Sequence, residues 1–308
     1  MGRDIDAALA LAMLHNLGRK GRLLANGVTT SSIEAAQFCD AVERFYSTPS
    51  PRGMSNRGAA VGLLEGSPKL PAAPMISGPL DMKNTAGSPL FPTTIHTLAD
   101  TADVRVLFRN LLTGENNGAA VAILAGPATD LAATLDLNGA ASLAAAKIRL
   151  LVVAAGAFSG GPIDPRIAAD VASARRLFEK WPSPIVAIGR EAAAAAPYPG
   201  QSIESDFSWA PAHPIAEAYR AFRAMPYDAP APAALAALYI DDESADYFRL
   251  SAPGRIEVSG DGRTQFTPTE GGRHRVLSVD PAAAGKIQQA MAALASAKPA
   301  PPRLRGRG

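Results

Sequence analysis

The feature that most constrains the fold is a continuous apolar run near the middle of the chain. Ile148–Ala155 (IRLLVVAA) presents apolar side chains on both faces when it is extended, which is typical of a central strand in a parallel sheet. On both sides of this run, short apolar stretches alternate with segments whose apolar residues recur every three or four positions, as they do in helices. The alternation predicts an α/β fold: a doubly wound, mainly parallel sheet with helices on both faces.

Further strands and helices follow from the same two patterns. The short apolar stretches predict strands at Arg22–Val28, Ala59–Leu64, Ala119–Ala125 and Pro184–Ile188. The periodic segments predict helices at Gly2–Gly18, Ile33–Tyr46, Thr101–Thr113, Thr129–Leu137, Ala168–Lys180, His213–Phe222 and Ala233–Ile240. Two stretches rich in Pro and Gly are predicted to be loops, a long one over residues 65–97 and a shorter one at Gly156–Arg166.

The pattern changes near the end of the chain. From Tyr247 onward, short strands separated by Gly-rich turns predict an antiparallel meander over residues 247–280, followed by a closing helix at Ala282–Ala295. With 308 residues, 47% of them hydrophobic, the chain can bury a full core, and we expect one domain over residues 1–297. The basic residues 298–308 are expected to form a flexible tail.

Charge and cysteine content exclude several classes of function. The net charge of +2 is too small to predict a specific nucleic-acid partner, and no apolar run is long enough to span a membrane. The single cysteine, Cys39, lies in a helix-like segment, where a buried, unreactive thiol is the expected role. We expect a cytoplasmic protein that could form a homo-oligomer.

Two aspartates stand at the start of the first predicted helix. Asp4 and Asp6 could cap the helix, because carboxylates there meet free N–H groups and the positive end of the helix dipole. They could equally ligate a hard cation or hold a water molecule for general-base catalysis. No strand precedes this helix in the sequence, so either the helix opens the domain or the chain is cut within its first strand–loop–helix unit.

Several stretches resemble the inosine-uridine-preferring nucleoside hydrolase family, in the family's own order. Gly2–Leu11 (GRDIDAALAL) resembles its Asp-Asp-Ala-Leu-Ala helix, and Ile123–Ala132 (ILAGPATDLA) resembles its Gly-Pro-Leu-Thr-Asn motif. The family's central strand, substrate loop and next helix are resembled by RLLVVAAGAFSGG and DPRIAADVASARRLF. Its later units are resembled by PIVAIGRE, HPIAEAYRAF, MPYDAP and ALAALY. The resemblance implies hydrolysis of the N-glycosidic bond of purine and pyrimidine ribonucleosides to ribose and base. It also implies a calcium ion that holds a water molecule and the ribose hydroxyls, with an aspartate as the base.

The resemblance assigns roles residue by residue. Asp6 and Asp4 match catalytic and calcium-binding aspartates, and the main-chain carbonyl of Ala125 matches a further calcium ligand. Two other ligand positions hold alanine, at Ala7 and Ala233.

The family's ribose-binding Glu-x-Asn falls on Asp164 and Arg166. Arg166 replaces a neutral amide with a cation and should oppose a nearby calcium ion.

Counting the carboxylates limits what the site can hold. Calcium takes six to eight oxygen ligands, and two carboxylates with water would hold it only in the millimolar range or not at all. Three hypotheses follow: an enzyme of this family with altered metal use, a catalytically decayed member that binds a ribosyl ligand or a protein partner, or an N-terminally truncated chain. Truncation would expose strand edges and predicts a chain that is poorly soluble or needs a partner.

Two later residues are candidates for substrate binding, each with a structural alternative. Asp228, in MPYDAP, could be a substitute carboxylate or could form a turn. His213, in PAHPIAEAY, could be catalytic or substrate-binding, or could cap the helix that it precedes. The other histidines have no second His or Cys at the spacing of metal ligands.

Overall fold

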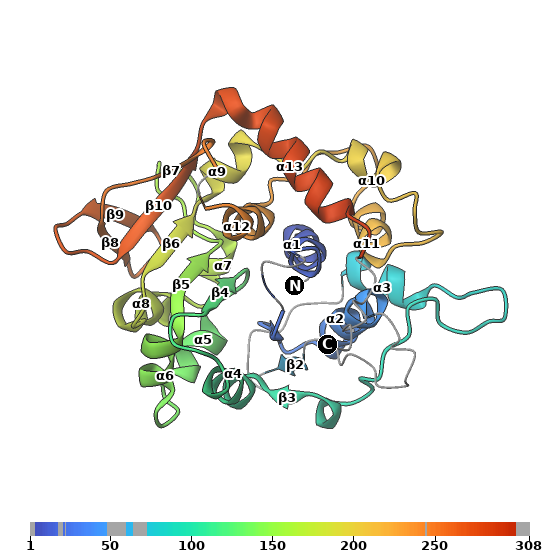
Figure 1. The fold of residues 1–308 in the computed structure, drawn as a ribbon, viewed down its shortest axis with the longest axis horizontal. Helices are drawn as coiled ribbons and strands as arrows, with labels where there is room; N and C mark the ends of the chain where they lie inside the picture. Colours follow the sequence, from blue (N-terminus) through green and yellow to red (C-terminus); the bar gives the residue numbers. More distant parts are fainter. Residues whose placement is uncertain are drawn as a thin grey trace, which may run out of the picture.

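The computed structural model describes residues 4–17, 21, 23–47, 60–63, 73–243 and 245–299 (Figure 1). Its strands form two sheets. The smaller sheet has the order β1-β2-β3, from Ala25–Val28, Ala60–Leu63 and Ala102–Asp103, and all its pairs are parallel. The larger sheet has the order β4-β5-β6-β10-β8-β9, with β7 beside β10. Its strands are Ala120–Leu124 (β4), Ile148–Val153 (β5), Ile185–Ile188 (β6), Phe248–Leu250 (β7), Gly254–Val258 (β8), Thr264–Pro268 (β9) and His274–Val279 (β10).

The central strand β5 shows why the chain folds in layers. Its side chains alternate between two apolar cores: Leu150 and Val152 face one core, and Leu151 and Val153 face the other. Helices α12 (Pro232–Asp241) and α1 (Asp6–His15) lie on the first side. Helices α5 (Thr129–Thr134), α6 (Ala140–Lys147) and α8 (Val171–Lys180) lie on the second (Figure 1). The prediction of a mainly parallel sheet with helices on both faces is confirmed.

The helices agree with the predicted segments in most places. They are α1 (Asp6–His15), α2 (Ile33–Tyr46), α4 (Val104–Thr113), α5 (Thr129–Thr134), α8 (Val171–Lys180), α11 (Pro214–Phe222), α12 (Pro232–Asp241) and α13 (Ala284–Ser296). The start of α2 is fixed by Ser32, whose hydroxyl accepts a hydrogen bond from the Ala35 N–H, as expected of a helix N-cap.

Among the described residues, five α-helices were not predicted. One of them, α3 (Pro74–Asp81), contradicts the predicted long loop over residues 65–97. Its Pro74, Gly78 and Pro79 suggested a loop, but a proline is tolerated in the first helical turn and Met75 and Ile76 bury one face. Another, the single turn α7 (Pro165–Ala168), begins inside the predicted loop Gly156–Arg166. The other three are short and rich in Ala or polar residues, so they carry no apolar period: α6 (Ala140–Lys147), α9 (Arg190–Ala195) and α10 (Gln201–Ser205). Residues 64–72 and the tail 300–308 lie outside the described residues.

The predicted meander is present and continues the main sheet. Strands β8 and β9 form an antiparallel hairpin, and β10 pairs antiparallel with β7 and β8. The other edge of β10 pairs parallel with β6, so the meander is hydrogen-bonded directly to the α/β core.

Helix α1 is buried among other helices near the middle of the molecule (Figure 1). Its residues from Ala8 to Met13 are all buried, and it packs against α12 and α13. The helix ends at Asn16, whose side-chain amide donates to the carbonyl of Leu294 in α13 at 2.9 Å. Gly18, the last residue of the predicted helix, lies outside the described residues. Because α1 is apolar on every side, it is stable only when other helices shield all its faces from water.

The two sheets meet at the carboxyl ends of β1 and β4. Among the described strands, each of these two pairs on one edge only. Thr29 follows β1 and Gly126 follows β4, and a Cβ added to Gly126 would lie 2.0 Å from the Thr29 hydroxyl oxygen. Because only glycine permits this approach, the two loops are held side by side at the edge where ligands bind in α/β folds.

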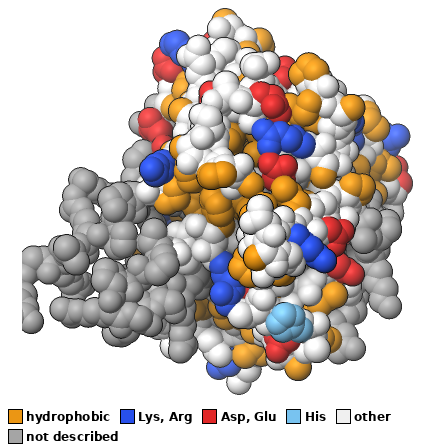
Figure 2. Space-filling model, turned by 90° about the vertical axis from the view of Figure 1, so that its right-hand side faces the viewer, with side chains coloured by type: hydrophobic (Ala, Val, Ile, Leu, Met, Phe, Trp, Pro, Cys, Tyr) orange, Lys and Arg blue, Asp and Glu red, His pale blue; other side chains and the backbone are white. Residues whose placement is uncertain are grey.

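Charged side chains of both signs are mixed on the surface in view (Figure 2), and the single cysteine is buried. On the face shown in Figure 2, positive and negative side chains are interspersed with apolar ones, and the positive ones form no continuous patch on that face. Within the described part of the chain, no helix combines the length and the apolar character needed to cross a membrane. Cys39 is buried, and burial raises its pKa to about 12, which leaves the thiol protonated and unreactive.

Candidate functional site: a buried arginine among aspartates

Residues from four distant parts of the sequence converge on one side chain, Arg166. We call this group the Arg166 cluster. It comprises Arg166 and Asp164 at the start of α7, Asp4 and Asp6 at the start of α1, Ala125 after β4, and Ala233 in the first turn of α12. Ala125 follows β4 and Arg166 follows β5, so the cluster lies at the carboxyl ends of parallel strands, where ligands bind in α/β folds.

The guanidinium of Arg166 binds three of these groups directly. Its Nη2 atom donates hydrogen bonds to Asp4 Oδ2 and to Asp6 Oδ2, both at 2.7 Å. Its Nε atom donates to the carbonyl oxygen of Ala125 at 3.3 Å. The Arg166 and Asp6 side chains are 9% and 0% exposed, so the bond between them is shielded from solvent, whereas the Asp4 side chain is 41% exposed.

The backbone around Arg166 is set by the residue two positions before it. Asp164 is the N-cap of α7, and its Oδ1 accepts a hydrogen bond from the Arg166 N–H at 2.8 Å. Pro165 occupies the first helical position, where its fixed φ suits the helix and its missing N–H costs nothing. The other carboxylate oxygen, Oδ2, lies 3.8 Å from Arg166 Nη1. The Asp-Pro-Arg sequence therefore both starts the helix and places a cation beside a carboxylate.

Asp6 is fully buried and is bound from two sides. Its Oδ2 accepts a hydrogen bond from the Ala233 N–H at 3.0 Å in addition to the bond from Arg166. The N-terminus of α12 therefore points at this carboxylate, which favours its charged form. Two oxygens, Asp6 Oδ1 and Asp164 Oδ2, are buried with no hydrogen-bond partner among the described residues.

The alternative that Asp4 and Asp6 only cap the first helix is wrong. The N-cap of α1 is Ile5, and no side chain makes a capping hydrogen bond there. Both carboxylates turn instead to the guanidinium of Arg166. Ala7 follows Asp6 in the first turn of α1, and its methyl group offers no oxygen to a cation.

Burial and the neighbouring charges shift the pKa values of Asp4, Asp6 and Arg166. Burial and the neighbouring Asp6 carboxylate raise the pKa of Asp4 to about 8. Burial acts to raise the pKa of Asp6 too, but the Arg166 guanidinium and the Asp4 and Ala233 hydrogen bonds hold it below its ordinary value. The nearby carboxylates raise the pKa of Arg166 despite its burial. One guanidinium therefore does not fully compensate three carboxylates.

The residues present do not fit a calcium ion as they stand. Calcium–oxygen bonds measure about 2.3–2.6 Å, and Arg166 Nη2 already lies 2.7 Å from two of the candidate oxygens. A dication cannot share that position with a guanidinium. In the described residues, no group of three or more His, Cys, Asp or Glu side chains has the geometry of a metal site. Weak or absent calcium binding remains a prediction, and the position of Arg166 gives it a physical reason.

His213 acts as the N-cap of α11. Its Nδ1 accepts a hydrogen bond from the Ile215 N–H at 3.2 Å, and its Nε2 lies 3.0 Å from the Tyr46 hydroxyl oxygen. The ring is 1% exposed, and burial lowers its pKa to about 3. Both ring nitrogens are engaged within the protein, so the structure supports the capping alternative over substrate binding.

Asp228 is exposed and lies directly before the bridge that pairs Ala229 with Tyr198. Its Oδ1 accepts a hydrogen bond from the Gly200 N–H at 2.8 Å, which joins two segments distant in the sequence. None of the described hydrogen bonds or ion pairs joins it to Arg166. A turn-forming role and a role in substrate binding both stay predictions.

Sequence reasoning missed what Arg166 binds. It placed Arg166 beside a calcium ion that the side chain should oppose, but it did not predict that the guanidinium would itself bind Asp4 and Asp6. The signal was available in the charge count, because buried aspartates without a dication require another cation.

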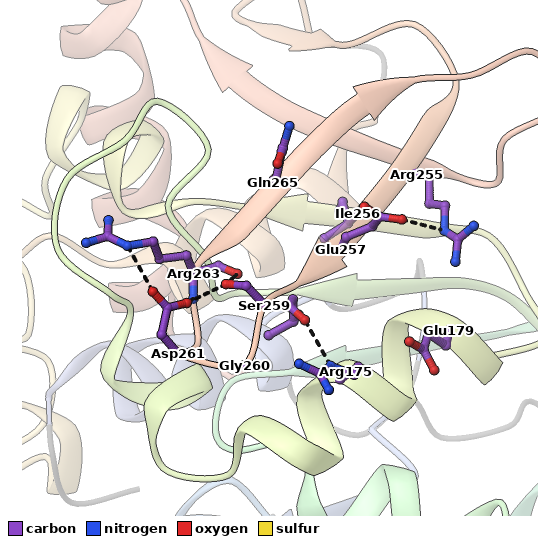
Figure 3. A pocket seen from close by; sticks show the side chains of 11 residues that line it. Arg175, Glu179, Arg255, Ile256, Glu257, Ser259, Gly260, Asp261, Arg263 and Gln265 are labelled. Atoms are coloured by element: carbon purple, nitrogen blue, oxygen red, sulfur yellow. Dashed lines mark hydrogen bonds and ion pairs between the residues drawn. The ribbon is translucent and has the colours of Figure 1, made fainter.

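A groove elsewhere on the molecule was not predicted either. It has a volume of about 570 Å³ and lies between α8 and the β8–β9 hairpin (Figure 3). Its charges are largely paired: Arg263 with Asp261, and Arg255 with Glu257. Arg175 donates to the carbonyl of Val258. These interactions account for the charged side chains that line the groove, apart from Glu179.

Comparison with known proteins identifies the fold. No protein-family model matches the sequence, and a search among curated proteins finds no match. Solved structures do match over nearly the whole chain. A plant nucleoside hydrolase, PpNRh1, is 17% identical with a TM-score of 0.65, over 95% of this chain and 97% of the other.

Two further structures support the same conclusion. The purine-preferring ribonucleoside hydrolase from Gardnerella vaginalis is 16% identical with a TM-score of 0.69, covering 96% of this chain and 98% of the other. The type III effector protein XopQ, solved in complex with adenosine diphosphate ribose, is 14% identical with a TM-score of 0.63, covering 96% and 91%. The chain therefore has the nucleoside hydrolase fold, as the sequence resemblance predicted.

Proposed function

We propose that this protein binds a ribosyl ligand on the nucleoside hydrolase fold without hydrolysing it by the calcium-dependent route. The observation that carries the proposal is the guanidinium of Arg166, which binds the Asp4 and Asp6 carboxylates and the Ala125 carbonyl. These are the oxygens that the family resemblance assigns to calcium. A cation that belongs to the chain itself cannot hold and ionise a water molecule as a metal does.

The aspartate that would act as the base in hydrolysis, Asp6, already accepts two hydrogen bonds within the protein. Asp6 is fully buried, and its Oδ2 is shared between Arg166 and the Ala233 N–H. An aspartate held in its charged form by two donors is a poor acceptor for a proton from water. Without a metal-bound water and a free base, the rate should fall by several orders of magnitude.

Ribosyl binding is supported by the neighbours and by the exposed part of the cluster. The matching structures include ribonucleoside hydrolases and an effector protein that holds adenosine diphosphate ribose. The Asp4 side chain is 41% exposed, so its carboxylate can accept hydrogen bonds from sugar hydroxyls. The loop before α7 has an exposed tip at Gly160 and Gly161, both with positive φ, beside the same edge of the sheet.

The proposal is tested by separating binding from turnover. Ribose, inosine and adenosine diphosphate ribose are titrated into the wild-type chain by calorimetry in the presence of a chelator. We expect at least one of them to bind, and Asp4→Asn to weaken that binding. Asp136→Asn, at an exposed aspartate, is the matched control and should leave binding unchanged.

Hydrolysis is measured with inosine, uridine and p-nitrophenyl riboside, with and without added calcium chloride. We expect no turnover above the uncatalysed rate in either condition. Turnover that rises with calcium would refute the proposal in favour of a metal-dependent hydrolase, and failure of all three ligands to bind would refute the ribosyl assignment.

A further inference from the structure

We infer that Arg166 occupies a latent divalent-cation site, and that replacing it with a neutral side chain converts the Arg166 cluster into one. Wild-type protein should ignore calcium because its own guanidinium is bound there. This inference goes beyond ribosyl binding, since it concerns what the cluster's oxygens would bind in the absence of Arg166.

The donors around the guanidinium are those that a hard cation prefers. Carboxylates of Asp4, Asp6 and Asp164 and the carbonyl of Ala125 all face it, and each supplies oxygen. Calcium binds such oxygens in flexible geometries, with water completing the shell. Asp6 Oδ1 and Asp164 Oδ2 are buried without hydrogen-bond partners among the described residues, so they are available as additional ligands.

These oxygens are held in place by groups other than Arg166. Asp164 is fixed as the N-cap of α7 by a backbone N–H, and Asp6 is fixed by the Ala233 N–H at the start of α12. Ala125 directly follows the central-sheet strand β4. Removal of one side chain therefore leaves most of the donor positions intact.

Once Arg166 is replaced, the negative charge of the remaining carboxylates favours binding of a divalent cation in place of the guanidinium. Three carboxyl groups face a single positive charge, and two of them are almost fully buried carboxylates: the Asp6 and Asp164 side chains are 0% and 1% exposed. Without Arg166, their mutual repulsion in a poorly solvated site would have no compensation from the protein. A divalent ion supplies more positive charge at the same position than the guanidinium did.

The experiment compares Arg166→Met and Arg166→Gln with wild type in calcium titrations. Arg166→Lys is the matched control, because it keeps a cation on the side chain. We expect wild type and Arg166→Lys to show no calcium-dependent change in melting temperature and no calorimetric signal. Arg166→Met should bind about one calcium ion per chain with a Kd of roughly 0.1–1 mM, the range of weak oxygen sites. Its melting temperature should rise with calcium.

A second variant shows which oxygens bind the ion. Adding Asp6→Asn to Arg166→Met should abolish the calcium response, because it removes the most buried carboxylate. Stoichiometric calcium binding to wild type would overturn the inference. A folded Arg166→Met that ignores calcium would also overturn it.

Loss of folding does not leave the inference untested. If Arg166→Met and Arg166→Gln fold only when calcium is present, the inference is supported. If neither folds with or without calcium, the remaining oxygens cannot hold the ion and the inference fails. Ribosyl binding is measured on wild type in a chelator, so either proposal can fail without the other.

Discussion

Replacement of Asp6 by asparagine tests the role of the buried charge pair most directly. Asp6→Asn keeps the shape of the side chain and an oxygen that can still accept from the Ala233 N–H. It removes the negative charge that lies 2.7 Å from Arg166 Nη2 in a side chain with no exposed surface. The substitution therefore isolates the charge from the packing.

The expected loss of stability follows from burial. Removing one partner of a buried ion pair costs about 3–5 kcal/mol, because the remaining charge is left without compensation. Asp4 and Asp164 still face Arg166, so we expect the lower end of that range, about 3 kcal/mol. Asp6→Ala should cost about 1 kcal/mol more, since it also leaves the Ala233 N–H without its acceptor.

The assay is urea unfolding at pH 7, followed by circular dichroism and by the fluorescence of Trp181 and Trp209. The matched control is Asp136→Asn, which removes a carboxylate from an arginine pair whose side chains are 60% and 42% exposed. Such a surface pair contributes about 0–1 kcal/mol. A loss below about 1 kcal/mol for Asp6→Asn, or a loss equal to that of the control, would refute the buried-pair reasoning.

Three further predictions rest on separate features. The pKa of Asp4 is raised from 3.8 to about 8 in the folded protein, so stability should fall as pH rises between those values. Asp4→Asn should flatten this slope in pH-dependent melts, by well under about 1.4 kcal/mol per pH unit because the side chain is 41% exposed. His213→Ala should cost about 3 kcal/mol in urea unfolding, through a lost helix cap and a cavity, whereas His213→Asn should recover the capping part. Gly200→Ala should cost about 3 kcal/mol by the same measurement, since its Cβ would lie 1.9 Å from the Tyr227 carbonyl oxygen, and Gly285→Ala, which meets nothing within 4 Å, should not destabilise.

The fold was predictable wherever a local pattern determined an element. The β5 strand, with apolar residues on both faces, and the α2 helix, with its periodic apolar residues, were recognisable without knowing their neighbours. Helix α3 was not, because Pro74 and Gly78 disfavour helices in isolation and only burial of Met75 against the core reveals its role. Tertiary packing overrode the local preference there.

The candidate site was predictable as a set of positions but not as an arrangement. Asp4, Asp6, Ala125 and Arg166 were all named from the sequence, and Arg166 was expected to oppose a calcium ion. The direct bonds from Arg166 to Asp4 and Asp6 join residues 162 and 160 positions apart, which no local pattern reports.

The sequence separation between α1 and its partners has a consequence for synthesis of the protein. Helix α1 is synthesised well before its partners α12 and α13, and the bond from Asn16 to Leu294 spans 278 residues. At about 5–20 residues per second, a ribosome needs roughly 14–56 s to extend the chain that far. During that interval the apolar helix has no native cover, so the nascent chain should be a substrate for chaperones that recognise exposed hydrophobic segments.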